Sequence, residues 1–240
     1  QVDIQEMNYD DCVRLAAKEA DETERGVIVQ DTAWDGYEEI PAWIMQGYGT
    51  MAMEAGEQLK EYGCERPTHI FVQAGVGSLA GAVVGYYSNL YADNPPTFVV
   101  VEAEAAACLY KGAAAGDGDI RIVDGDMETI MAGLACGEPN TISWDILKNH
   151  VKVFIAAPDW VAANGMRMLG APIKGDAPVT SGESGAAPFG ALAAVMTMDE
   201  YKDLRNDIGL DASSKVLLFS TEGDTDPDRY KNIVWKGLDK

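Results

Sequence analysis

The stretch QAGVGSLAG, at positions 73–81, carries glycines and small polar residues that are suited to holding an anion. It follows an apolar run, HIFV, that predicts a buried strand, and it precedes a segment with helical spacing. Free backbone amides at a helix N-terminus bind phosphate, because the helix dipole favours negative charge and glycine lets a ligand approach the main chain. The stretch therefore predicts a phosphate site, with a plain packing turn as the alternative.

A dinucleotide is one ligand that this stretch is able to hold. Gly75, Gly77 and Gly81 form a G-x-G-x-x-x-G variant, and Glu102 ends the next predicted strand, where an acidic residue would grip a ribose. On this interpretation the protein is a dinucleotide-dependent oxidoreductase. A single phosphate on a smaller ligand fits the same glycines, so the local pattern leaves both interpretations open.

Three further segments place polar side chains at predicted strand ends or helix starts. Asp31 follows the apolar run at 27–30, SGES (181–184) opens a predicted helix, and STEGDTD (220–226) follows the last predicted strand. Ligands of open parallel sheets bind at the carboxyl ends of the strands, so we expect these loops to converge on one crevice. Ser220 near a phosphate site fits a small aromatic phosphate better than a long dinucleotide.

Alternating strands and helices must position these loops. The apolar runs predict strands at 2–5, 27–30, 68–72, 98–105 and 152–157, and a last one that begins at 215. Helical spacing predicts helices at 9–23, 41–62, 78–92, 105–114, 141–150, 159–170 and 181–197. The continuous β-branched run at 99–101 is typical of a strand buried on both faces of a parallel sheet. We therefore predict an α/β fold with a mainly parallel, twisted sheet and helices on both faces.

The composition narrows the classes of partner. Lys and Arg total 18 against 39 for Asp and Glu, which gives a formal charge of -21. This charge repels nucleic acid and anionic lipid, so neither is an expected partner. No apolar stretch reaches the roughly 20 residues of a membrane span and no signal peptide is visible, which predicts a soluble, cytoplasmic protein. His and Cys spacing predicts no metal site.

Two of the four cysteines are candidates for a disulfide. Cys108 follows the strand that ends at Glu102, and Cys136 lies in the loop ACGEPN. If both loops border the crevice, the two Cβ atoms come within a bridging distance of about 4 Å. Two buried free thiols are the alternative, and they are the norm for a cytoplasmic protein.

Several contiguous motifs resemble one family of enzymes over essentially the whole chain. They are MNYDD, VQDTAWDGY, QAGVGSLAGAVVGYY, TIMAGLACGEPN, SGESGA and STEGDTD. They are similar to those of the diaminopropionate ammonia-lyases, which use pyridoxal phosphate and share the fold (fold type II) of the tryptophan synthase β-subunit and threonine dehydratase group.

The resemblance implies roles for particular residues. Gly75, Val76, Gly77 and Ser78 are expected to hold the cofactor phosphate through their amides, and Ser220 to bond the pyridine nitrogen. A neutral hydroxyl there leaves the ring nitrogen largely unprotonated, which favours elimination over transamination.

The lysine that attaches the cofactor in this family is not expected within these residues. None of the lysines present lies in a matching Asn-x-x-Lys context, and the family's Thr-Thr-Asp-Gly-Asn-His-Gly segment is also missing. The resemblance therefore implies the C-terminal portion of the enzyme, with the lysine in an N-terminal segment. On this mapping residues 1–40 end a small domain, and 41–240 form most of a large cofactor-binding domain. This chain alone is expected to be inactive.

The implied reaction is α,β-elimination of 2,3-diaminopropionate to pyruvate and ammonia. The β-amine leaves poorly unless it is protonated, so a carboxylate is expected beside it, and Asp31 is the first candidate. The alternative for Asp31 is a loop-forming or helix-capping acid. A homodimer is implied by the resemblance. A dinucleotide-dependent oxidoreductase and a non-catalytic fragment or binding module remain alternative functions.

Overall fold

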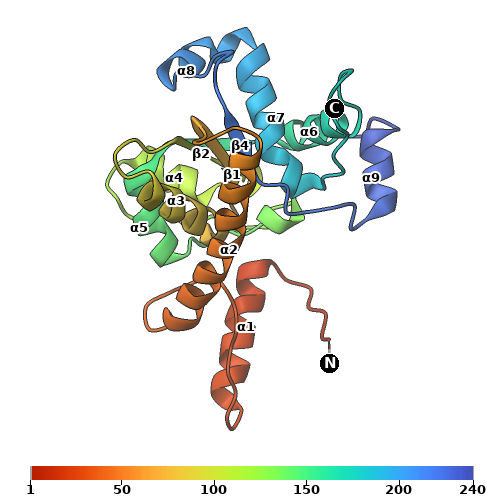
Figure 1. The fold of residues 1–240 in the computed structure, drawn as a ribbon. Helices are drawn as coiled ribbons and strands as arrows, with labels where there is room; N and C mark the ends of the chain where they lie inside the picture. Colours follow the sequence, from red (N-terminus) through yellow and green to blue (C-terminus); the bar gives the residue numbers. More distant parts are fainter. Residues whose placement is uncertain (1, 240) are drawn as a thin grey trace.

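A four-stranded parallel sheet forms the centre of the computed structural model, which describes residues 2–239 (Figure 1). The strands are β1 (His69–Gln73), β2 (Thr97–Ala103), β3 (Val151–Ala157) and β4 (Val216–Leu218), in the order β3-β2-β1-β4. β1 is thus central, with β2 and β4 as its parallel neighbours. All four strands point the same way, so their carboxyl ends lie at one edge of the sheet, as the sequence predicts.

Helices cover both faces of this sheet. The long helices are α1 (Tyr9–Glu22), α2 (Glu39–Glu61), α3 (Ser78–Leu90), α5 (Thr141–His150), α6 (Asp159–Gly170) and α7 (Glu183–Thr197). The shorter ones are α4 (Cys108–Ala115), α8 (Lys202–Asp207) and α9 (Pro227–Val234), with single 3-10 turns at Glu104–Ala106, Ala132–Leu134 and Asp199–Tyr201. The two-sided cover confirms the predicted α/β class.

The two apolar cores follow from the alternation of side chains along the strands. Phe71 points to one face and packs in a cluster with α6 and α7, whereas Ile70 and Val72 point to the other face and pack against α3 and α5. Every residue of β1 is buried, because helices lie on both of its faces. Burial on both faces explains why β1 and β2 are continuous apolar runs in the sequence.

Two predicted strands are not strands in the structure. Residues 2–5 and 27–30 have no regular secondary structure, and Val27 and Val29 are 71% and 70% exposed. An apolar, β-branched run forms a strand only beside another strand that shares its backbone hydrogen bonds. Within residues 2–239 no strand lies beside 27–30, so the sequence interpretation is wrong for the described chain.

The structure contains two short helices near the C-terminal end that the sequence interpretation missed. α8 and α9 were not predicted from the sequence, although Asp226 accepts a hydrogen bond from the Arg229 amide and Pro227 opens α9, a regular helix start. α1 lies away from the sheet, at the opposite end of the molecule from α8 (Figure 1).

Among the described residues, no helix is both long enough and apolar enough to cross a membrane.

Candidate functional site

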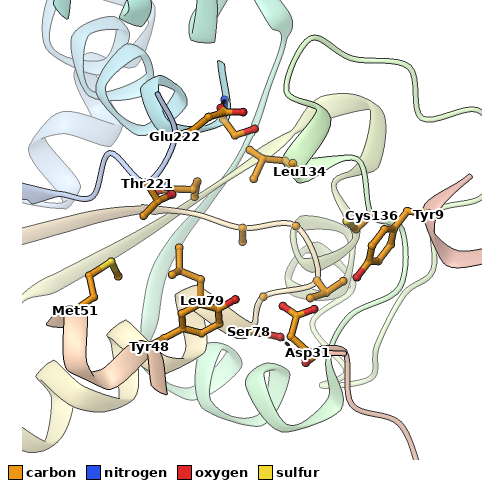
Figure 2. A pocket seen from close by; sticks show the side chains of 17 residues that line it. Tyr9, Asp31, Tyr48, Met51, Ser78, Leu79, Leu134, Cys136, Thr221 and Glu222 are labelled. Carbon is orange, nitrogen blue, oxygen red and sulfur yellow. Dashed lines mark hydrogen bonds between the residues drawn. The ribbon is translucent and has the colours of Figure 1, made fainter. Parts of the chain in front are cut away.

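A cavity of about 570 Å³ opens at the carboxyl end of β1. Its walls come from α1, the Asp31 loop, α2, the glycine loop after β1, the 133–136 segment, the start of α7 and the loop after β4 (Figure 2). These segments are far apart in the sequence. The expected convergence of loops at the carboxyl edge of the sheet is therefore present for the Asp31 loop, the glycine loop, the start of α7 and the loop after β4.

The glycine loop presents free backbone amides to this cavity. The Ala74 amide donates to the Val101 carbonyl (2.9 Å) and the Gly81 amide to the Gly77 carbonyl (2.7 Å). Between them, the amides of residues 75–78 have no oxygen acceptor within the described chain. They stand at the N-terminus of the 13-residue helix α3, where the helix dipole adds to their attraction for an anion.

Glycine is required at position 77 of the loop, and position 75 is tightly packed. Gly77 has φ +100°, which L side chains rarely adopt, and a Cβ there would lie 2.8 Å from Ser143 Oγ. A Cβ at Gly75 would lie 3.2 Å from Cys136 Sγ. The two glycines therefore let the loop pass close to its neighbours with its amides turned toward the cavity.

Asp31 is held against the start of α3 by its own backbone. Its carbonyl accepts hydrogen bonds from Ser78 Oγ (2.8 Å) and from Asn140 Nδ2 (2.7 Å). Asn140 is fully buried, and its Oδ1 accepts from the Ser143 amide (3.0 Å), which caps α5. The position of Asp31 is thus fixed by the same elements that hold the glycine loop.

The Asp31 side chain lies between two tyrosines, Tyr48 of α2 and Tyr9 of α1 (Figure 2). Burial raises the pKa of both phenols, and the negative charge of Asp31 raises each further. Both tyrosines are therefore neutral at physiological pH. The cavity combines one carboxylate with two neutral hydroxyls, a polar set suited to a cationic amine.

Ser220 is not among the residues that line this cavity, whereas the adjacent Thr221 is. The Ser220 hydroxyl donates instead to Ser181 Oγ (2.8 Å). Successive side chains of extended backbone point in opposite directions, so only one of these two neighbours faces the cavity. The structure thus places Ser220 apart from the other predicted site residues, and the sequence interpretation passed over Thr221.

The SGES and STEGDTD segments meet at the start of α7. One oxygen of the Glu222 carboxylate accepts from the amides of Ser184 (2.6 Å) and Gly185 (3.3 Å), so this helix N-terminus already holds an anionic side chain. Gln73 Oε1 and Ser184 Oγ are buried without a hydrogen-bond partner among the described residues, and both residues line the cavity. Unpaired polar atoms beside free amides fit a polar, phosphorylated ligand.

Glu102 does not line the cavity, so the acidic residue that was expected to bind a ribose is not in place to do so. Its two oxygens accept from the amides of Leu109 (2.8 Å) and Tyr110 (2.7 Å) at the start of α4. The side chain is 1% exposed, and burial raises its pKa to about 8 against the opposing effect of these two hydrogen bonds. Glu102 is a buried cap for α4, so the geometry disfavours the dinucleotide interpretation.

Cys108 and Cys136 lie close together, and both are free thiols in the structure. Cys108 Sγ is 3.7 Å from the carbonyl oxygen of Cys136. Burial raises the pKa of the Cys136 thiol to about 12, with further contributions from Asp10 and Asp31, and burial also raises the pKa of Cys108. Their pairing in a disulfide stays a prediction.

Known proteins that resemble this chain bind the kind of phosphorylated ligand that the cavity fits. The family model described as pyridoxal-phosphate dependent enzyme matches residues 1–216. The diaminopropionate ammonia-lyase of Salmonella typhimurium is 55% identical over 235 residues, and that of Escherichia coli K12 is 49% identical over 234 residues. Each match covers 98% of this chain but 58% of the relative, so the chain spans less than two thirds of the length of these relatives.

Solved structures give the same result. The E. coli diaminopropionate ammonia lyase in complex with an aminoacrylate-PLP azomethine reaction intermediate matches with a TM-score of 0.90 and 47% identity, over 98% of this chain and 59% of that one. A serine racemase from maize matches with a TM-score of 0.60 and 22% identity, over 81% of this chain and 52% of that one, which indicates a shared fold. On the family match and the site geometry together, the chain belongs to the pyridoxal-phosphate-dependent enzyme family.

Proposed function

We propose that the complete protein containing this chain is a pyridoxal-phosphate-dependent ammonia-lyase that acts on 2,3-diaminopropionate. The observation that carries the proposal is a single cavity in which a loop of free amides faces a carboxylate, Asp31. The relatives from Salmonella typhimurium and Escherichia coli K12 bear the name of this activity. The reaction consumes one water and yields pyruvate and two molecules of ammonia.

The residues present fit the cofactor. The amides of Gly75, Val76, Gly77 and Ser78 are proposed to bind its phosphate. The hydroxyl of Thr221, and not that of Ser220, is proposed to meet the pyridine nitrogen, because Thr221 lines the cavity. When bound, pyridoxal phosphate withdraws electrons from the α-carbon of an amino acid and so stabilises the negative charge left by loss of its proton.

Asp31 is proposed to recognise the second amino group of the substrate. Its carboxylate pairs with the β-ammonium, keeps that group protonated and thereby makes it a better leaving group. A substrate with a neutral β-substituent leaves the carboxylate unpaired in a partly desolvated cavity, which lowers its affinity. The neutral hydroxyls of Tyr9 and Tyr48 add hydrogen-bonding partners without adding a competing charge.

The finer features rest on the resemblance to the ammonia-lyases. We propose that the lysine that attaches the cofactor lies in a segment of the same protein that the present residues do not include, and that the complete enzyme is a cytoplasmic homodimer of fold type II. Residues 1–40 are proposed to end its small domain, with 41–240 in the large domain. The position of α1 away from the sheet supports this division (Figure 1).

Replacement of Asp31 tests the proposal. In the complete protein with pyridoxal phosphate, Asp31→Asn is expected to lower kcat/KM for pyruvate formation from 2,3-diaminopropionate by about two to four orders of magnitude, as is usual for a positioned acid or base. Cofactor absorbance should persist, because Asp31 is assigned to the substrate. Asp35→Asn is the matched control, since Asp35 is an exposed carboxylate of the same loop outside the cavity. Unchanged turnover in Asp31→Asn would make Asp31 a loop-forming acid.

A further inference from the structure

Gln73 forms a link between the central strand and the loop after β4. It is the last residue of β1 and is 3% exposed. Its Nε2 donates to the carbonyl oxygen of Phe219 (2.9 Å) and to Oγ1 of Thr221 (2.9 Å). One amide nitrogen therefore uses both of its hydrogens on neighbours at the edge of the cavity.

The orientation of this amide is fixed by the chemistry of its partners. The Phe219 carbonyl is only an acceptor, so the atom facing it must be the amide nitrogen and not the amide oxygen. A flipped amide would place Oε1 against that carbonyl and lose both hydrogen bonds. Gln73 is therefore a donor toward Thr221.

This orientation determines what Thr221 offers to the cavity. A hydroxyl has one hydrogen and two lone pairs, and the Gln73 amide already occupies one lone pair of Thr221 Oγ1. The hydroxyl hydrogen cannot point back at the Gln73 nitrogen, and no other acceptor for it is found among the described residues. Thr221, which lines the cavity, is thus set up to donate its hydrogen into the cavity.

We infer that Gln73 is a positioning residue that makes Thr221 a hydrogen-bond donor to the cofactor ring, so that the ring nitrogen is bound without a proton. The inference rests on the proposed function, which places the ring nitrogen at Thr221. An unprotonated ring withdraws electrons less strongly than a protonated one, which favours release of the β-amine over transamination of the cofactor. Gln73 thereby sets the course of the reaction without touching the substrate.

The state of the ring nitrogen is directly measurable. The complete protein is reconstituted with pyridoxal phosphate labelled with nitrogen-15 in the ring, and the chemical shift of that nitrogen is recorded by NMR. The wild-type protein is expected to give the shift of an unprotonated pyridine. A protonated ring nitrogen in the wild type, with cofactor bound, overturns the inference and leaves the proposed function standing. A complete protein that binds no pyridoxal phosphate overturns both.

Two variants of Gln73 separate its hydrogen bonding from its packing. In Gln73→Glu the introduced carboxylate only accepts, so the Thr221 hydroxyl turns to donate to it and offers a lone pair to the ring. We expect the nitrogen-15 shift to move toward the protonated position and the share of turnovers that end in transaminated cofactor to rise. Gln73→Leu keeps similar volume but removes the donor, so the Thr221 hydroxyl is free to turn, and the nitrogen-15 shift should lie between those of the wild type and Gln73→Glu.

The variants also have an outcome that contradicts the inference. If the shift in Gln73→Glu equals that in the wild type while the cofactor remains bound, Gln73 does not determine the direction of the Thr221 hydroxyl. If Gln73→Glu does not fold, Gln73→Leu decides the question: a nitrogen-15 shift equal to that of the wild type, with the cofactor bound, overturns the inference.

Discussion

The buried carboxyl of Glu102 should make the stability of the protein fall as the pH rises through neutrality. Burial raises the pKa of this group from 4.5 to about 8 in the folded protein. Between these two values the folded protein holds a proton that the unfolded chain has released. The contribution of Glu102 to stability is therefore complete below pH 4.5 and is lost as the pH rises to about 8.

The magnitude follows from the same values. Each pH unit within this window lowers the free energy of unfolding by about 1.4 kcal/mol, and the whole window is worth about 5 kcal/mol. Glu102→Gln removes the titration. It also turns an amide NH2 group toward the amide of Leu109 or Tyr110, and this donor facing a donor lowers stability by about 1–3 kcal/mol at low pH.

Urea unfolding of the complete wild-type protein and of Glu102→Gln, measured from about pH 5 to about pH 8, provides the test. The wild type should start as the more stable protein at the acidic end, and its advantage should shrink by about 1.4 kcal/mol for each pH unit. Glu104→Gln is the matched control, because Glu104 is exposed, and its curve should run parallel to that of the wild type. A constant difference between wild type and Glu102→Gln over this range would refute the reasoning.

Three other predictions concern the cavity. Gly77→Asp should weaken cofactor binding by about two orders of magnitude, because amide contacts are lost and the new carboxylate repels the phosphate. Equilibrium binding of pyridoxal phosphate to the complete protein measures this affinity, and an unchanged value would show that the phosphate binds elsewhere. Asn140→Ala removes a hydrogen bond to the Asp31 carbonyl and should lower kcat/KM at least about tenfold with the cofactor still bound. Kinetics equal to those of the wild type would mean that the position of Asp31 does not depend on this hydrogen bond. Cys108 and Cys136 should form a disulfide under oxidising conditions, and they should do so slowly at neutral pH because burial raises the pKa of Cys136 to about 12. Peptide mapping of the unreduced protein tests this, and recovery of only free thiols at both positions would contradict it.

The central strands of the sheet were predicted closely from a local signal in the sequence. β1 and β2 were predicted to within about two residues, because helices on both faces make each a continuous apolar run. Residues 27–30 carry the same signal and are not a strand, since a strand also requires a neighbour for its backbone hydrogen bonds. A local pattern reports side-chain preference and cannot report the presence of that neighbour.

The site shows the same division. The glycine loop and Asp31 were found because each carries a signal within a few residues of sequence, and both line the cavity. Choosing between Ser220 and Thr221 requires knowing which of the two side chains points into the cavity. Neighbouring side chains after β4 point in opposite directions, so a shift of one residue reverses the answer. Tyr48 joins the cavity from a helix and carries no local signal, so only the tertiary structure identifies it.

The crystal structure of the complete protein with pyridoxal phosphate bound tests the central claim most directly. We expect the phosphate oxygens to accept hydrogen bonds from the amides of residues 75–78 at the start of α3, and the ring nitrogen to lie within hydrogen-bonding distance of Thr221 Oγ1. A cofactor whose phosphate lies away from the glycine loop, with the cavity beside Asp31 empty, would contradict the assignment of this cavity as the active site.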